Sequence, residues 1–239
     1  MSDDNAFRQV LRDLYDRIVV RDWPLGVGGV LIGLTSVLVF CWDRPWGVVG
    51  GLRIWADWLF YGIGLYGEAP SPALVNTNSV IVLGLIWGAL AASLLSRNFA
   101  FRVPPKLELA KGVVGGVLIG TGAALAGGCN VGGFYSSISA MSLSGVVMMV
   151  GLLAGAWAGL KYLYWEMEHL PSGGAAARPS KAGKVDWKRV QPWLGWLLLA
   201  AAYGAWWLYR LDGYPIEGGV LLFGVVFGVI LVKSRFCFA

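Results

Sequence analysis

Long apolar runs separated by short polar segments dominate the chain. Such runs predict membrane-spanning helices, because a helix needs about 20 apolar residues to cross the hydrocarbon core of a bilayer. Two of the runs are short, Arg53–Tyr66 and Gly112–Ala126, which predicts broken or re-entrant helices near their ends. The pattern predicts an all-α polytopic membrane protein with about six or seven transmembrane helices. The runs are Pro24–Trp42, Arg53–Tyr66, Ser79–Leu95, Gly112–Ala126, Ser144–Tyr164, Pro192–Tyr209 and Gly218–Val232.

Polar segments divide these runs into four predicted regions. Residues 1–23 form a polar cap or an amphipathic surface helix, and residues 171–190, rich in Ser, Gly, Ala and Pro, form a flexible cytoplasmic linker. Residues 24–170 are then a first transmembrane repeat, and residues 191–239 are the start of a second. Repeats of this kind are common in transporters. The residues that favour an amphipathic first helix are Phe7, Val10, Leu11, Leu14 and Ile18.

The composition supports a membrane protein and excludes other classes. Hydrophobic residues make up 57% of the chain and charged residues 14%, values that exclude a water-soluble enzyme and a disordered chain. The 13 Trp and nine Tyr are typical of aromatic belts at the membrane interfaces. The net charge is +5, and the basic residues lie in short loops between the apolar runs, which indicates topology signals rather than a nucleic-acid site.

The distribution of Lys and Arg predicts the orientation of the chain. The segments Arg97–Lys111 and Trp165–Gln191 are rich in basic residues and should be cytoplasmic, whereas Gly67–Asn78 has no Lys or Arg and should face the other side. Counting back from Gly67–Asn78 through the two preceding runs places the N-terminus outside as well.

Reactive side chains are few. The chain has three Cys at wide spacing and a single His169, so neither a disulfide framework nor a metal site is predicted, and no cofactor is expected. The motifs of ATP-driven pumps and of membrane hydrolases are absent from the sequence, so the chain is not predicted to be an enzyme.

The strongest local feature is the segment Gly127-Gly128-Cys129-Asn130-Val131-Gly132-Gly133. Its glycines predict a break in a helix, and a break at membrane depth is tolerated only inside the protein or beside a polar cavity. A short helix over Phe134–Met141 would direct its N-terminus at the break, where it attracts anions and leaves Cys129 in a positive field. The alternative is that the glycines allow close packing and Cys129 is a small apolar filler.

The two other thiols have weaker local signals. Cys237 lies between Phe236 and Phe238 after the last apolar run, where Lys233 and Arg235 also fit an ordinary cytoplasmic end. Cys41 precedes Asp43-Arg44-Pro45-Trp46, which favours simple termination of a helix by proline.

Three segments together resemble the YeeE/YedE sulfur-transport family of bacterial inner-membrane proteins. They are Arg44-Pro45-Trp46-Gly47-Val48-Val49-Gly50-Gly51, Ala126-Gly127-Gly128-Cys129-Asn130-Val131-Gly132 and Ser234-Arg235-Phe236-Cys237-Phe238-Ala239. The resemblance implies a two-repeat, channel-like fold in a multi-pass inner-membrane protein that passes thiosulfate or a related sulfur-containing ion inward. It places Cys129 and Cys237 in the path, and Cys41, which matches no family cysteine, is kept as a further candidate for the path.

The resemblance also implies which residues surround the substrate and what else is needed. The implied path residues are Cys129, Cys237, Gly127, Gly128, Asn130, Gly132, Phe236 and Trp46. Members of the family usually carry a second Gly-Gly-Cys segment beyond the Phe-Cys-Phe motif, so a downstream segment or a second chain is expected to complete the pore. The alternatives are a membrane sulfur carrier, which passes persulfide sulfur from Cys129 to a cytoplasmic carrier protein, and a structural membrane subunit.

Overall fold

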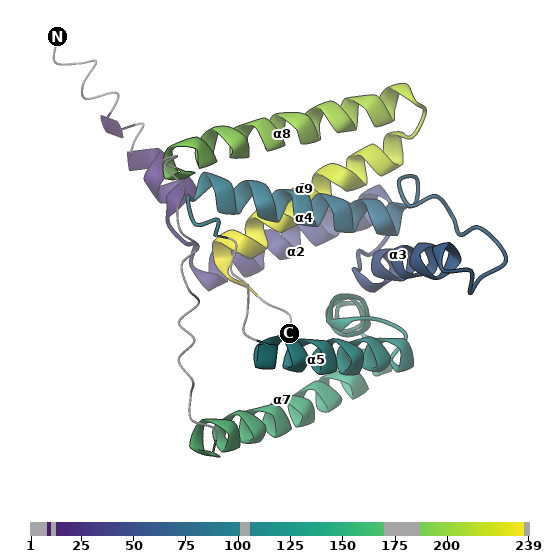
Figure 1. Cartoon of the computed structure of the whole chain (residues 1–239). Coiled ribbons are helices and arrows are strands. Elements are labelled where there is room, and N and C mark those ends of the chain that lie inside the picture. Colours follow the sequence, from purple (N-terminus) through teal and green to yellow (C-terminus); the bar gives the residue numbers. More distant parts are fainter. Residues whose placement is uncertain (1–8, 11–12, 101–105, 170–186, 237–239) are drawn as a thin grey trace, which may run out of the picture. The chain divides into compact units, whose positions relative to one another are not determined.

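A computed structural model of the chain describes residues 9–10, 13–100, 106–169 and 187–236. In the part described, all regular structure is helical, as the apolar runs predict (Figure 1). The elements in chain order are η1 Asp16–Val20, α2 Leu25–Trp42, α3 Val49–Gly62, α4 Thr77–Leu95, α5 Lys106–Leu125, η2 Asn130–Ser136, α6 Ser137–Ser139, α7 Leu143–His169, α8 Trp187–Leu211 and α9 Pro215–Ser234.

Each of the seven predicted runs corresponds to a helix. Among the described residues, five helices are long and apolar enough to cross a membrane: α2, α4, α5, α7 and α9. Helix α3 has only 14 residues, and α8 has 25 residues but is rich in Trp and Tyr. The expectation that Gly112–Ala126 is short is wrong, because α5 extends back to Lys106 and has 20 residues.

The chain divides by internal packing into two units, residues 1–100 with 183–239 and residues 101–182. This division follows contacts and is independent of the predicted repeats, whose boundaries stay a prediction. Most of the predicted linker, residues 171–186, lies outside the described residues.

The core of the first unit is the crossing of α4 and α9, with α2 and α8 alongside (Figure 1). Glycines from both helices let the backbones touch. A methyl group at Gly88 would collide with the Val225 carbonyl, and one at Gly228 would collide with the Leu85 carbonyl. The buried side chains around this crossing include Val80, Phe227 and Ile230.

Hydrogen bonds at the two ends of this unit fix the direction of each helix. At one end, the Trp23 backbone N–H donates to the Lys233 carbonyl at 2.7 Å. At the other, the Trp42 indole N–H donates to the Ile216 carbonyl at 3.3 Å. Helix α2 is therefore antiparallel to α9, and the end of α2 lies beside the start of α9.

The N-terminal segment lies at the end of the unit where α4 and α9 finish. The Tyr15 hydroxyl donates to the Leu95 carbonyl at 3.1 Å, and the Ser96 hydroxyl donates to the Val19 carbonyl at 2.9 Å. Burial raises the pKa of the Tyr15 hydroxyl, which keeps it protonated and able to donate. The expectation that the N-terminus lies on the opposite side from Arg97 is therefore wrong.

The reason for this correction is that α3 does not cross the unit. Gly51 in its first turn packs against Asn78 and Val82 of α4. One turn later, the Trp55 indole N–H donates to the Ser79 hydroxyl at 2.6 Å. The Trp58 indole N–H donates to the Ser71 carbonyl at 3.0 Å, so α3 lies against the start of α4 and the loop before it. The prediction counted α3 as a crossing, and removing that crossing reverses the side of the N-terminus.

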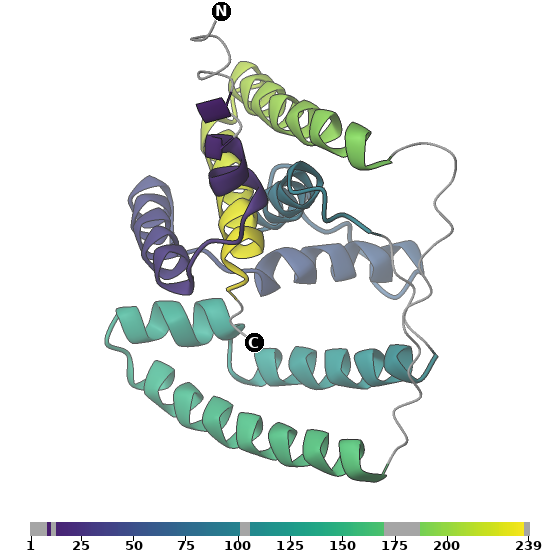
Figure 2. The same ribbon diagram turned by 90° about the vertical axis from the view of Figure 1, so that its left-hand side faces the viewer.

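The second unit repeats the order of a long helix, a short one and a long one that α2, α3 and α4 have in the first. Helix α5 is followed by η2 and α6, which form one short helical stretch, and α7 then returns (Figure 2). The short stretch packs along α7.

Candidate functional site

The Gly-Gly-Cys segment forms a tight turn that is fastened to the end of α5. Gly127 has a φ of +69°, in the left-handed region that glycine adopts without steric cost. The next amide, Gly128 N–H, donates back to the Ala123 carbonyl at 3.0 Å. This bond satisfies a carbonyl that the end of α5 would otherwise leave without a hydrogen-bond donor. The predicted break is therefore present, and it follows a spanning helix directly.

Cys129 lies at the start of the short helical stretch. Its backbone is extended, with φ −80° and ψ 179°, and its carbonyl accepts the Gly133 N–H at 2.6 Å. The helix begins at Asn130 and ends at Ser139, so the expected boundaries of Phe134–Met141 are wrong. The π-helix η2 starts at Asn130 and therefore includes Gly132 and Gly133. Cys129 is half-buried and is not in a disulfide.

The short stretch is held in place by α7. A Cβ at Gly133 would lie 2.7 Å from the Met148 sulfur, and a Cβ at Gly145 would lie 2.7 Å from the Ile138 nitrogen. At Gly145 the close atoms are backbone, so only glycine permits this approach, whereas at Gly133 the Met148 side chain would have to move. The Ser137 hydroxyl donates to the Gly132 carbonyl at 3.1 Å and closes the first turns.

In the first unit, the corresponding break lies between α2 and α3. Trp46 is 3% exposed, stacks on Phe227 with ring centroids 4.0 Å apart, and donates to the Ser36 hydroxyl at 2.9 Å. It is thus part of the core of this unit, and its place in a substrate path stays a prediction.

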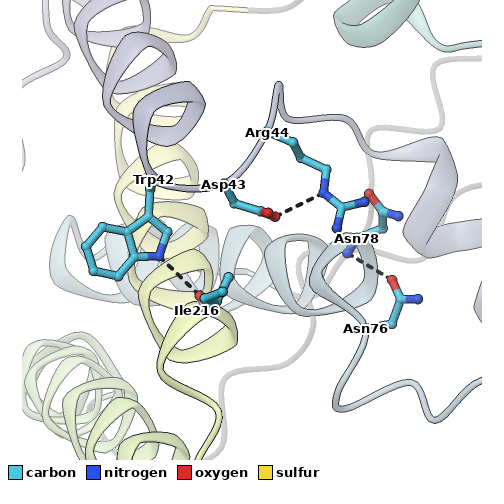
Figure 3. Close-up of polar contacts among 6 residues, drawn as sticks. All are labelled: Trp42, Asp43, Arg44, Asn76, Asn78 and Ile216. Atoms are coloured by element: carbon cyan, nitrogen blue, oxygen red, sulfur yellow. Dashed lines mark hydrogen bonds and ion pairs between the residues drawn. The ribbon is translucent and has the colours of Figure 1, made fainter.

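A small cavity opens beside Trp46 at the same break, and Asp43, Arg44 and Asn78 are among the residues that line it. Figure 3 shows the polar contacts of these three residues and of their neighbours. The Arg44 guanidinium forms an ion pair with Asp43 at 3.0 Å. Asn76 caps α4 by accepting the Asn78 N–H at 3.0 Å. The sequence analysis missed both asparagines, although Asn before an apolar run is a recognisable helix start.

The remaining predicted site residues are spread over the first unit. Cys41 is exposed on α2. A Cβ at Gly29 of the same helix would lie 3.9 Å from the Phe236 ring. Cys237 lies outside the described residues. The structure therefore brings Gly127, Gly128, Cys129, Asn130 and Gly132 together on one turn of the second unit, and Trp46 and Phe236 belong to the first.

Lys233 is a buried polar residue whose contacts the sequence did not predict. It is 3% exposed, and its ammonium donates to the Val19 carbonyl at 2.6 Å and to the Ser96 hydroxyl at 3.1 Å. Next to it, Arg235 pairs with Asp22 at 2.7 Å. These bonds fasten the N-terminal segment over the ends of α4 and α9.

Comparison with known proteins gives the family. The model of the family described as Sulphur transport matches residues 3–158. The chain belongs to the Sulphur transport family. This match covers α2 to α7 for most of their length, including both breaks.

The chain is also similar in sequence to individual proteins whose names describe them as transporters. The chain is 28% identical over 206 residues to the protein named Probable transporter YedE of Escherichia coli K12, covering 81% of this chain and 51% of that protein. It is 30% identical over 135 residues to the Thiosulfate transporter TsuA of the same organism, covering 56% of this chain and 38% of that protein. A TsuA of Spirochaeta thermophila is 30% identical over 133 residues, covering 55% and 39%. The chain thus spans about half the length of the Escherichia coli YedE protein and less than half the length of the two TsuA proteins. No solved structure matches.

Proposed function

We propose that this chain forms part of a bacterial inner-membrane permease for thiosulfate or a related sulfur-containing anion. The observation that carries the proposal is the position of Cys129, on a glycine turn between a spanning helix and a short helical stretch. Membership of the Sulphur transport family and similarity to proteins named thiosulfate transporters support it.

The chemistry of such a site suits a sulfur oxyanion. An anion that enters the hydrocarbon must have its hydration shell replaced, because even one unsolvated charge costs several kcal/mol there. The positive end of a short helix and a weak, polarizable S–H donor can replace water without holding the ion too tightly to release it. Cys129 would supply the thiol, with Gly127, Gly128, Asn130 and Gly132 giving the backbone close approach to the substrate.

Other residues would complete the path. In this proposal Cys237, Phe236 and Trp46 line further parts of it, and a downstream segment or a second chain covers the remaining faces. The long exposed sides of α5 and α7, whose most apolar windows are each 6% buried, offer surface to lipid or to such a partner.

The test is thiosulfate uptake by cells that lack their own uptake systems and that are supplied with the downstream segment or with a second chain bearing the Gly-Gly-Cys motif. We expect Cys129→Ala to abolish uptake while the amount of protein in the membrane stays the same. Cys41→Ala is the matched control, because Cys41 is exposed on α2 and matches no family cysteine. Normal uptake by Cys129→Ala would reject the role of the thiol and favour its role as a packing residue.

The same assay separates the alternatives. A permease moves the intact anion into vesicles that contain no acceptor protein, whereas a sulfur carrier needs a cytoplasmic acceptor before sulfur is transferred. A structural subunit gives neither result. Supplying a chain that bears the second Gly-Gly-Cys motif tests whether a partner completes the path.

A further inference from the structure

A charged pair joins the two long helices of the second unit. Lys111 in the second turn of α5 forms a hydrogen-bonded ion pair with Glu166 near the end of α7. The side chains are 33% and 23% exposed. Both helices are among the candidate membrane spans, where an isolated Lys or Glu is costly and a pair costs less.

The pair joins helices that otherwise have little direct contact. Close packing on α7 comes from η2 and α6 rather than from α5. Within the described residues, α5 and α7 share no other hydrogen bond or ion pair that would hold them together. Apart from the turn and short stretch that connect the two helices, this pair is the polar contact that links them in the described residues.

Cys129 lies between the turn that is hydrogen-bonded to α5 and the short helical stretch that packs on α7. On its N-terminal side, the Gly128 N–H bond to the Ala123 carbonyl fastens the turn to α5. On its C-terminal side, Gly133 lies against Met148 and thereby fastens the short stretch to α7. A shift of α5 relative to α7 would therefore be taken up in the turn at residues 127–133, which contains Cys129.

We propose that the Lys111–Glu166 pair is a clasp that sets the geometry and accessibility of the Cys129 turn. The pair acts at a distance, since Lys111 is separated from the end of α5 by about 21 Å of helix at 1.5 Å per residue. Lys111 and Glu166 are positioning residues in this proposal. Their effect on transport rests on the proposed function, but their effect on the Cys129 thiol does not.

The test measures the alkylation rate of Cys129 by N-ethylmaleimide in the membrane-embedded full chain, with Cys41 and Cys237 replaced by serine. We expect Lys111→Met and Glu166→Gln each to change this rate about fivefold or more, because each removes one partner of a coupled pair. The exchange of both residues, Lys111→Glu with Glu166→Lys, should return the rate to within about twofold of the parent. Lys161→Met is the control, since Lys161 lies on α7, like Glu166, and its ammonium lies over the Trp157 ring, 4.2 Å from the centroid.

The double variant Lys111→Met with Glu166→Met keeps the test valid if the single variants fail to accumulate, because it leaves no unpaired charge in the membrane. It should insert and still show the altered rate. A parental alkylation rate in this variant would overturn the clasp. Thiosulfate uptake is measured in parallel on variants that retain all three cysteines. A changed alkylation rate with no uptake by the parent, even when a chain bearing the second Gly-Gly-Cys motif is supplied, would reject transport and leave the clasp standing.

Discussion

At the scale of single residues, glycine decides which helices can touch. Gly84 and Gly88 of α4 face Gly224 and Gly228 of α9, and added methyl groups would meet backbone at all four. Gly112, Gly116 and Gly120 of α5 have the same spacing, yet a Cβ at any of them meets nothing within 4 Å. Glycines with the same spacing are thus tightly packed between α4 and α9 but have open space beside them on α5.

We expect Gly88→Ala to destabilise the protein by at least about 2 kcal/mol, because the new methyl group would have to push α4 and α9 apart. Gly116→Ala should instead be neutral or stabilise the protein by up to about 1 kcal/mol through helix propensity. Thermal unfolding of both variants in the same detergent measures the difference. An unchanged midpoint for Gly88→Ala would mean that the crossing is looser than described.

Lys233 is a second residue whose effect depends on tertiary contacts. Lys233→Met should destabilise the protein by about 1–3 kcal/mol, since it removes two hydrogen bonds from a buried ammonium. The loss should also free the N-terminal segment, which limited proteolysis would detect as faster cleavage near Arg17 and Arg21. Arg53→Met is the control, because the Arg53 side chain is 81% exposed. Equal cleavage of the two variants would show that Lys233 does not hold the segment.

At the scale of elements, the two breaks use different means to stop a spanning helix. After α2, Asp43 and Pro45 end the helix, and α3 then lies against the start of α4. After α5, Gly127 ends the helix in a left-handed turn, and the next stretch lies against α7. Proline removes a backbone donor, whereas glycine permits a conformation that other residues avoid. In each unit the short helix, α3 or the stretch η2–α6, therefore lies on the side where the preceding long helix, α2 or α5, ends.

The position of α3 gives a direct prediction about accessibility. Gly47 and Gly67 flank α3, and a Cβ at either meets nothing within 4 Å, so cysteine fits at both sites. In a variant without native cysteines, Gly47→Cys and Gly67→Cys should react with an impermeant thiol reagent from the same side of the membrane. Gly26→Cys, at the opposite end of α2, should react from the other side. Labelling of positions 47 and 67 from opposite sides would show that α3 crosses.

At the scale of the whole molecule, charge predicts which ends face the cytoplasm. The N-terminal segment, Ser96 and the end of α9 lie at one end of the first unit, and this end carries Arg21, Arg97, Lys233 and Arg235. The positive-inside rule places such an end in the cytoplasm. The segment Arg97–Lys111 begins there, which agrees with its predicted orientation.

We therefore expect Asn98→Cys and Ser180→Cys, each in a variant without native cysteines, to resist an impermeant thiol reagent added to intact spheroplasts. Permeabilised cells should label both positions and serve as the control. Position 180 lies outside the described residues, and its prediction rests on the basic residues of Trp165–Gln191. Rapid labelling in intact spheroplasts would reverse the orientation.

Local patterns in the sequence were enough to determine the helical membrane fold and the break before Cys129. Apolar length predicts a spanning helix because the bilayer has a fixed thickness, and paired glycines predict a break because they lack a helix-favouring side chain. Both properties act over a few neighbouring residues, so no distant contact was needed to recognise them.

Only the tertiary structure decided which helices cross and which charged groups are paired. An apolar run of intermediate length, such as Arg53–Tyr66, predicts a crossing until the contacts of Trp55 with Ser79 place it beside α4. Lys111 and Glu166 are 55 residues apart, and Lys233 and Val19 are 214 apart. Pairing over such separations depends on how the helices pack, and the periodicity of a single segment contains no information about its distant partners.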